Sequence, residues 1–150
     1  MCIRDSYVSS QGYEDVMVSP VTAVNGNDQE AAAEAIAACD IMATAVGARI
    51  LKFIVGNIVA GLRKRWQRTD MPLNIIICEN LMDANRILER MLKEQLTEEE
   101  CRKFDETVGL VEASIGRMVP VQTEEMKDGA PLRGWVERYG YLPEAGAPFK

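Results

Sequence analysis

The sequence predicts an α/β fold built on an open, doubly wound parallel sheet. Three apolar runs, at residues 40–47, 73–80 and 108–117, each end in polar or small residues, and helical patterns surround them. A run of this kind is typical of a buried parallel strand. Since the carboxyl ends of parallel strands lie at one edge of a sheet, where open α/β folds bind ligands, we expect one crevice at that edge.

The elements follow one another in an order that favours right-handed parallel crossovers. We expect an edge strand or two short strands over 16–24, which contain Pro20, and then a turn at 25–28 in which Asp28 caps a helix over 30–36. A strand over 40–45, a helix from Ala48 and a strand over 73–78 follow. After these we expect a helix over 81–95, a second helix that opens with a capping box at 97–100, and a strand over 108–115. The helix from Ala48 has one broad apolar face formed by Ile50, Leu51, Ile54, Val55, Ile58, Val59 and Leu62.

Composition limits the classes of partner. The chain has 150 residues, 47% of them hydrophobic, and this is enough for one core of ordinary size. A net charge of -6 argues against nucleic acid or an anionic membrane as a general partner. The basic run at residues 63–68 is the exception, and its position predicts a solvated helix end rather than a binding patch.

Cysteine and histidine content excludes further chemistry. The four cysteines have no paired spacing, so we expect neither a disulfide framework nor a metal site. Histidine is absent from the sequence, which excludes a Ser-His or Cys-His nucleophile and a histidine general base from this stretch. No apolar run approaches the roughly 20 residues of a membrane span, and we expect a cytoplasmic protein.

Both ends of the sequence suggest an internal fragment. Met1–Ser6 resembles the translated adapter that begins some metagenomic gene models, so residues 1–15 are left as a non-native or unassigned start. Residues 143–150 form a connection rich in proline and glycine.

Three segments in this order resemble the long-chain mannitol dehydrogenase family: Asp40-Ile-Met-Ala-Thr-Ala-Val-Gly47, Pro72-Leu-Asn-Ile-Ile-Ile-Cys-Glu-Asn80 and Val108-Gly-Leu-Val-Glu-Ala-Ser-Ile-Gly-Arg-Met-Val-Pro120. The resemblance covers residues 16–150. It implies that 16–120 form the second half of an NAD-binding Rossmann domain and that 121–150 lead into a helical substrate domain. It also places the glycine-rich phosphate loop before this chain and the catalytic lysine after it.

Cofactor-binding residues follow from the resemblance and from side-chain size. Thr44, Ala45, Val46 and Gly47 end a strand with small side chains, against which the ribose and pyrophosphate of NAD could lie. The alternative is an ordinary turn between strand and helix, with glycine present for packing.

The family's matching asparagine indicates that Asn80 is catalytic. Its neutral amide suits a group that polarises a carbonyl or holds a developing alkoxide during hydride transfer. The alternative is a helix cap for the segment after Leu81. Glu79 is assigned to the cofactor site, where it would order Asn80 or bind ribose; alternatively it is a helix-dipole partner.

Ile115 matches a position at which the family places an apolar side chain against the nicotinamide ring; the alternative is a core strand residue. The family usually has Asp where this sequence has Gly116, which removes a possible partner of Arg117.

The predicted function is hydride transfer between NAD and a polyol phosphate of the mannitol 1-phosphate or fructose 6-phosphate type, with the fragment itself inactive. The alternatives are a tagaturonate or fructuronate reductase of the same family, or a non-catalytic nucleotide-binding module. The sequence distinguishes neither the sugar nor NAD from NADP, and it leaves the oligomeric state open.

Overall fold

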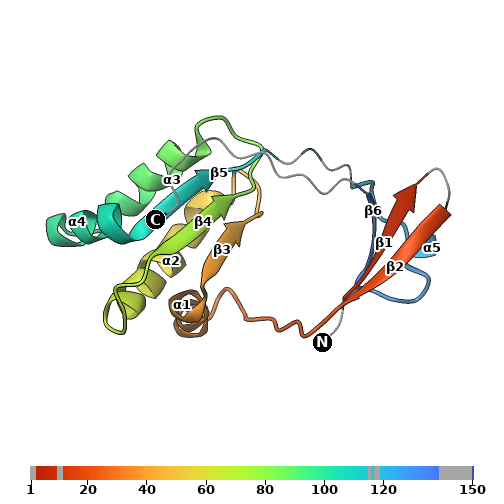
Figure 1. Ribbon diagram of the computed structural model, residues 1–150, viewed down its shortest axis with the longest axis horizontal. Coiled ribbons are helices and arrows are strands. Elements are labelled where there is room, and N and C mark those ends of the chain that lie inside the picture. Colours follow the sequence, from red (N-terminus) through yellow and green to blue (C-terminus); the bar gives the residue numbers. More distant parts are fainter. Residues whose placement is uncertain (1–2, 10–11, 115, 117–118, 139–149) are drawn as a thin grey trace. The chain divides into compact units, whose positions relative to one another are not determined.

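The computed structural model describes residues 3–9, 12–114, 116, 119–138 and 150. The chain divides into two compact units: unit 1 combines residues 1–23 with 116–141, and unit 2 holds 24–115 and 142–150. Each unit has its own three-stranded sheet (Figure 1). This division differs from the predicted one, in which 16–120 form a single domain.

Unit 2 contains the predicted parallel sheet. Its strands are β3 (Ile41–Thr44), β4 (Leu73–Ile77) and β5 (Val108–Glu112), in the order β3-β4-β5. Both pairs are parallel. The predicted α/β class and the three predicted strands are therefore confirmed.

One helix precedes β3 and three helices lie between the strands, all close to the predicted positions. They are α1 (Gln29–Ala38), α2 (Leu51–Trp66), α3 (Ala84–Lys93) and α4 (Glu98–Thr107). Asp28 caps α1 by accepting a hydrogen bond from the Ala31 N–H at 3.1 Å. Both hydrogen bonds of the Thr97–Glu100 capping box are present at the start of α4. Local signals thus located these helix starts, because capping bonds involve residues near one another in sequence.

The core of unit 2 lies between the sheet and helices α2 and α3. Leu73, Ile75 and Ile77 of β4 are fully buried, whereas the alternate residues Asn74 and Ile76 are half-buried. The strand order advances in one direction without reversing, and right-handed crossovers then place the connecting helices on one face. The described part is therefore singly covered, and the doubly wound arrangement stays a prediction.

The apolar stripe of α2 is confirmed with one exception. Its buried members are Leu51, Val55, Ile58, Val59 and Leu62. Ile50 precedes the first turn and is 47% exposed, because α2 begins later than the sequence predicted.

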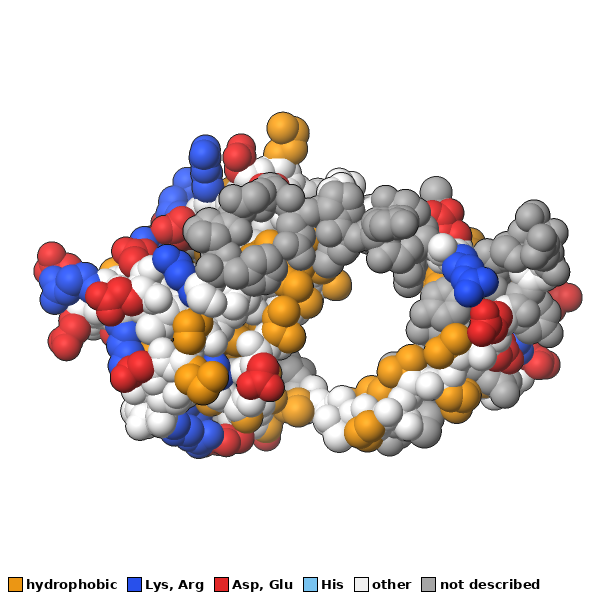
Figure 2. Space-filling view, viewed as in Figure 1, with side chains coloured by type: hydrophobic (Ala, Val, Ile, Leu, Met, Phe, Trp, Pro, Cys, Tyr) orange, Lys and Arg blue, Asp and Glu red, His pale blue; other side chains and the backbone are white. Residues whose placement is uncertain are grey.

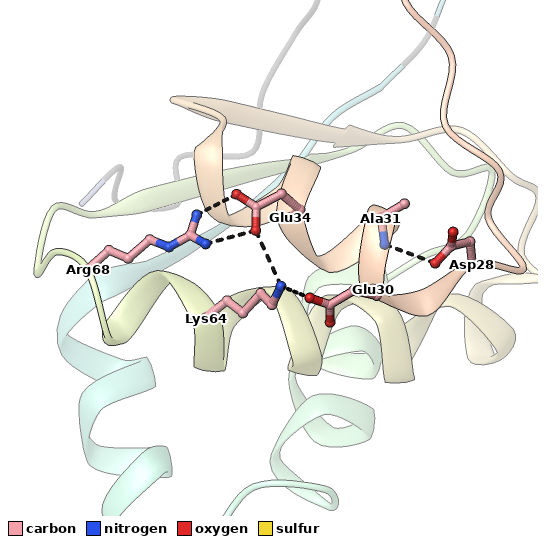
Figure 3. A network of polar contacts seen from close by, with 6 residues as sticks. All are labelled: Asp28, Glu30, Ala31, Glu34, Lys64 and Arg68. Atoms are coloured by element: carbon pink, nitrogen blue, oxygen red, sulfur yellow. Dashed lines mark hydrogen bonds and ion pairs between the residues drawn. The ribbon is translucent and has the colours of Figure 1, made fainter.

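The basic run at the end of α2 is mostly engaged in contacts within the unit. Arg68 donates two hydrogen bonds to the Glu34 carboxylate of α1, at 2.6 and 2.8 Å, and Lys64 pairs with both Glu30 and Glu34 (Figure 3). These bonds lower the pKa of the Glu34 carboxyl to about 2, and the hydrogen bond from Arg68 makes the largest contribution. Arg63 makes a bidentate pair with Glu100 of α4 at 2.7 and 2.9 Å.

Arg65 corrects the prediction of a solvated helix end. Its side chain is buried, and its guanidinium donates to four backbone carbonyl oxygens. These belong to Ala37 at 3.1 Å, Cys39 at 2.7 Å, Met71 at 3.2 Å and Pro72 at 3.0 Å. The side chain thereby joins the end of α1 to the segment that enters β4.

Two glycines of α2 provide a matched pair for testing the α1–α2 contact. A Cβ at Gly61 would lie 2.5 Å from the Cβ of Ile36, whereas one at Gly56 would meet only the Gln29 Nε2 at 3.6 Å. We expect Gly61→Ala to destabilise the protein by about 1–3 kcal/mol through overpacking. Gly56→Ala should stabilise it by about 0.5–1 kcal/mol through helix propensity. Urea unfolding of both variants measures the difference, and a gain of stability at both positions would contradict this close packing.

Unit 1 is built from the two ends of the chain. Strands β1 (Ile3–Ser9) and β2 (Gly12–Val18) pair antiparallel, and β6 (Arg133–Glu137) pairs parallel with β1. A short helix, α5 (Glu124–Lys127), precedes β6. Of the edge strand or two short strands expected over 16–24, residues 16–18 form the end of β2, which lies at the edge of this sheet, and residues 19–24 are not strand.

The other two strands of unit 1 were missed from sequence. The sequence predicts no element over residues 1–15 and only a connection over 121–150, yet these segments supply β1 and β6. The Gln122 side chain replaces a strand partner for β6: its Oε1 accepts from the Trp135 N–H at 2.8 Å and its Nε2 donates to the Trp135 carbonyl at 3.2 Å. That the first residues are non-native stays a prediction.

Charges of both signs are interspersed over the helical side of unit 2 on the face drawn in Figure 2. Among the described residues, no helix is long and apolar enough to cross a membrane. In the same ranges, no group of three or more acidic, cysteine or histidine side chains is placed to hold a metal ion.

Candidate active site

The predicted site residues that the structure describes, Thr44 to Gly47 with Glu79 and Asn80, come together at the carboxyl edge of the parallel sheet. Strand pairing continues to that edge, since the Cys78 N–H donates to the Thr44 carbonyl at 2.9 Å and the Ala113 N–H to the Ile77 carbonyl at 3.2 Å. The loops after β3 and β4 leave the sheet on the same side (Figure 1). Residues 44–47 and 79–80 therefore share one edge, as the sequence predicted.

Glu79 joins the two loops. It follows β4, is only 8% exposed, and its carboxylate accepts hydrogen bonds from two consecutive backbone amides of the loop after β3. The Val46 N–H donates to Oε1 at 2.9 Å and the Gly47 N–H to Oε2 at 2.8 Å. The helix-dipole interpretation is wrong, because α3 begins at Ala84 and Glu79 lies outside its first turn.

The segment after β3 forms the predicted sharp turn into α2. Gly47 has φ +91°, in the left-handed region that favours glycine, and its carbonyl accepts from the Ile50 and Leu51 N–H groups at 2.8 and 3.2 Å. Ala45, Val46 and Gly47 are exposed. The turn therefore exposes small side chains at the sheet edge, and the Glu79 carboxylate holds its backbone through the two hydrogen bonds from Val46 and Gly47.

Thr44 is placed differently from the other three residues of its segment. Its side chain is 1% exposed, and its hydroxyl oxygen is buried with no hydrogen-bond partner among the described residues. A side chain so buried does not form part of the exposed turn surface. Its carbonyl instead anchors the start of the next loop through Cys78.

Asn80 is exposed and directly follows the buried Glu79. Within the described ranges its side chain makes no hydrogen bond, so its amide is free to face a ligand. The helix-cap interpretation is wrong: the N-cap of α3 is Asp83, at φ 54°, three residues farther along. Asn80 therefore lies in the loop and not at the helix terminus.

A second carboxylate lies at this edge and was not singled out from the sequence. Glu112 ends β5, and its Oε1 accepts from the Ala84 N–H at 3.3 Å, at the start of α3. The sequence did offer a signal for this residue, since Glu112 stands at the end of a predicted strand and is followed by small residues. Ile115 and Arg117 lie outside the described residues, whereas Gly116 is described and exposed.

Cys78 does not supply a nucleophile here. Burial raises the pKa of its thiol, and the negative charge of Glu79 raises it further. The thiol is therefore protonated near neutral pH, and reactive cysteines need the thiolate. The neutral amide of Asn80 is exposed at this edge.

Comparison with known proteins identifies the family. A model described as the mannitol dehydrogenase Rossmann domain matches residues 3–140. The chain is 37% identical over 119 residues to mannitol-1-phosphate 5-dehydrogenase of Bacillus pumilus, covering 79% of this chain and 31% of that protein. It is 35% identical over 141 residues to the enzyme of that name from Lactococcus lactis, covering 89% and 37%.

The same name is carried by a Bacillus subtilis relative that is 34% identical over 133 residues, covering 88% of this chain and 34% of that protein. The chain thus spans about a third of the length of the curated relatives it matches. With the parallel sheet, the edge site and a match over nearly the whole sequence, the chain belongs to the mannitol dehydrogenase family, through the Rossmann domain of that family.

Proposed function

We propose that this chain is the second half of the cofactor domain of an NAD-dependent polyol-phosphate dehydrogenase, of the mannitol 1-phosphate or fructose 6-phosphate type. The observation that carries the proposal is the amide of Asn80, which is exposed and makes no hydrogen bond to the residues that the structure describes, beside the small-residue turn that Glu79 holds at the sheet edge. Relatives bearing the name mannitol-1-phosphate 5-dehydrogenase support the substrate class.

The residues at the edge fit the uncharged part of a dinucleotide. Ala45, Val46 and Gly47 are small or apolar and exposed, so a ribose or a flat ring can approach the backbone there. The Val46 and Gly47 amides are already bonded to the Glu79 carboxylate. A phosphate would have to compete with that internal negative charge, so we propose that the ribose, and not the pyrophosphate, lies on this turn.

When bound, NAD would supply the hydride acceptor. The Asn80 amide would donate a hydrogen bond to the substrate oxygen, which becomes more negative as the hydride leaves the adjacent carbon. Because an amide does not titrate, this donor is present at any physiological pH. We assign the base that takes the proton of the substrate hydroxyl to the rest of the longer protein; of the groups in this chain, histidine is absent and the Cys78 thiol is protonated, so neither serves as that base.

The remaining machinery is assigned to parts of a longer protein. Since the chain covers about a third of its relatives, we propose that a phosphate-binding loop, a catalytic lysine and a helical substrate domain belong to the rest of that protein. The isolated 150 residues would then have no turnover. A tagaturonate or fructuronate reductase is the alternative within the family, and a non-catalytic nucleotide-binding module is the alternative outside it.

Assays of the complete reading frame test this proposal. We expect reduction of NAD with mannitol 1-phosphate, followed by NADH absorbance, and no turnover by the isolated chain. Oxidation of NADH with tagaturonate or fructuronate alone would favour the reductases. Dinucleotide binding without turnover on any of these substrates would favour the non-catalytic module, and turnover by the isolated chain would contradict the fragment proposal.

A further inference from the structure

Two consecutive backbone amides at the β3–α2 turn point to one carboxylate. The Val46 and Gly47 N–H groups donate to the two separate oxygens of Glu79, at 2.9 and 2.8 Å. Glu79 lies 33 positions after Val46 and 32 after Gly47 in the sequence, so this is a tertiary contact and not a local cap.

This arrangement has the form of an occupied anion site. Successive backbone N–H groups next to a residue in the left-handed region form a concavity that binds anions, and Gly47 supplies that conformation at φ +91°. Hydrogen bonds to a carboxylate are shorter and stronger than those between neutral groups. Glu79 is 8% exposed, so little water competes with the two amides for its oxygens.

Other roles for this carboxylate fit less well. It lies outside the first turn of α3, so it does not act on that helix dipole. Both of its oxygens already accept from the backbone, so it is not a free acid or base. Glu112, at the end of the neighbouring strand, makes one longer bond of 3.3 Å to a single amide.

We propose that Glu79 is a positioning residue that fills the anion-binding concavity of the β3–α2 turn; this inference rests on the proposed function. With the concavity filled, the turn receives the uncharged ribose part of the dinucleotide and excludes its phosphates. The same contact holds the main chain immediately before Asn80. Glu79 therefore sets the relative position of the turn and of the catalytic amide without contacting the reacting atoms.

Hydrogen exchange tests the internal anion directly. In Glu79→Gln, an NH₂ donor replaces one acceptor, and we expect the Val46 and Gly47 amides to exchange about tenfold faster or more, the scale of losing a hydrogen bond to a charged group. Glu112→Gln is the matched control and should affect Ala84 only. Unchanged exchange at Val46 and Gly47, or faster exchange throughout unit 2, would overturn the proposal.

Inorganic phosphate is the probe for the concavity. In Glu79→Ala the two amides lose their internal partner, so added phosphate should slow their exchange again. In the unmodified protein phosphate should have no effect at these two amides, because the carboxylate occupies them. Equal protection by phosphate in both proteins would overturn the exclusion of phosphates.

Kinetics of the complete enzyme separate positioning from stability. For Glu79→Gln we expect KM for NAD to rise about tenfold and kcat to fall by a smaller factor, since the turn is held less firmly and the Asn80 donor is misplaced but not removed. A fall in kcat with KM unchanged would overturn the positioning role. If the unmodified enzyme shows no dinucleotide-dependent turnover, the proposed function fails, and the exchange measurements still decide whether Glu79 is the internal anion.

Discussion

In the complete enzyme, Asn80→Ala is expected to lower kcat by about 10² or more while leaving the affinity for NAD nearly unchanged. Loss of one hydrogen-bond donor to a developing oxyanion has this scale because the donor acts mainly in the transition state. The structure supports the test: Asn80 is exposed, and the N-cap of α3 is Asp83. Removal of the amide should therefore cost little stability.

Two further variants sharpen this test. Asn80→Asp keeps the size but places a negative charge where negative charge develops, so its kcat should fall below that of Asn80→Ala. Asn85→Ala is the control, since the Asn85 side chain bonds only locally to the Arg86 N–H at 2.9 Å. Full activity in Asn80→Ala, with a lowered melting temperature, would remove Asn80 from the active site.

Arg65→Met is expected to give the largest loss of stability in unit 2, about 3 kcal/mol or more. Methionine keeps much of the apolar stem but leaves the carbonyls of Ala37, Cys39, Met71 and Pro72 without their shared donor. These carbonyls lie at the end of α1 and at the entry to β4; the bond to Ala37 is buried and the other three are part-buried. Each acceptor left unpaired in a buried site adds to the cost.

Arg68→Met is the matched control, since Arg68 is exposed and pairs with the exposed Glu34. Its effect should be much smaller, because surface ion pairs contribute little to folding. Urea unfolding followed by Trp66 fluorescence in a Trp135→Phe background reports unit 2 alone. Equal losses for the two variants would show that the carbonyl contacts of Arg65 do not stabilise the fold.

Local patterns predicted the elements of unit 2 well. The apolar runs became β3, β4 and β5, and Asp28 and Thr97 cap α1 and α4 as expected. Period and capping depend on residues a few positions apart, so they can be recognised in one sequence. Unit 1 could not be recognised in this way, because β1 pairs with β6 from the opposite end of the chain.

The candidate site was predicted in part for the same reason. Gly47 at a sharp turn and Asn80 at a strand end are signals carried by neighbouring residues, and the structure places both at one sheet edge. The partner of Glu79 was not predictable, because it lies 32 and 33 residues away. The burial of Thr44 was not predictable either, since successive side chains of a strand point to opposite faces and the local sequence does not say which face is covered.

By itself, the sequence determined the α/β class, the parallel strand–helix order and the residues gathered at the carboxyl edge, because periodicity and turn chemistry are local. Only the tertiary structure decided which basic side chain is buried, which amides meet the Glu79 carboxylate and which termini share a sheet. Those contacts join segments distant in the chain, and the sequence carries no local mark of which donor meets which acceptor. Arg65 is the clearest example: its neighbouring cations in the sequence are exposed or half-buried, yet its own side chain is buried and bonded to four backbone carbonyls.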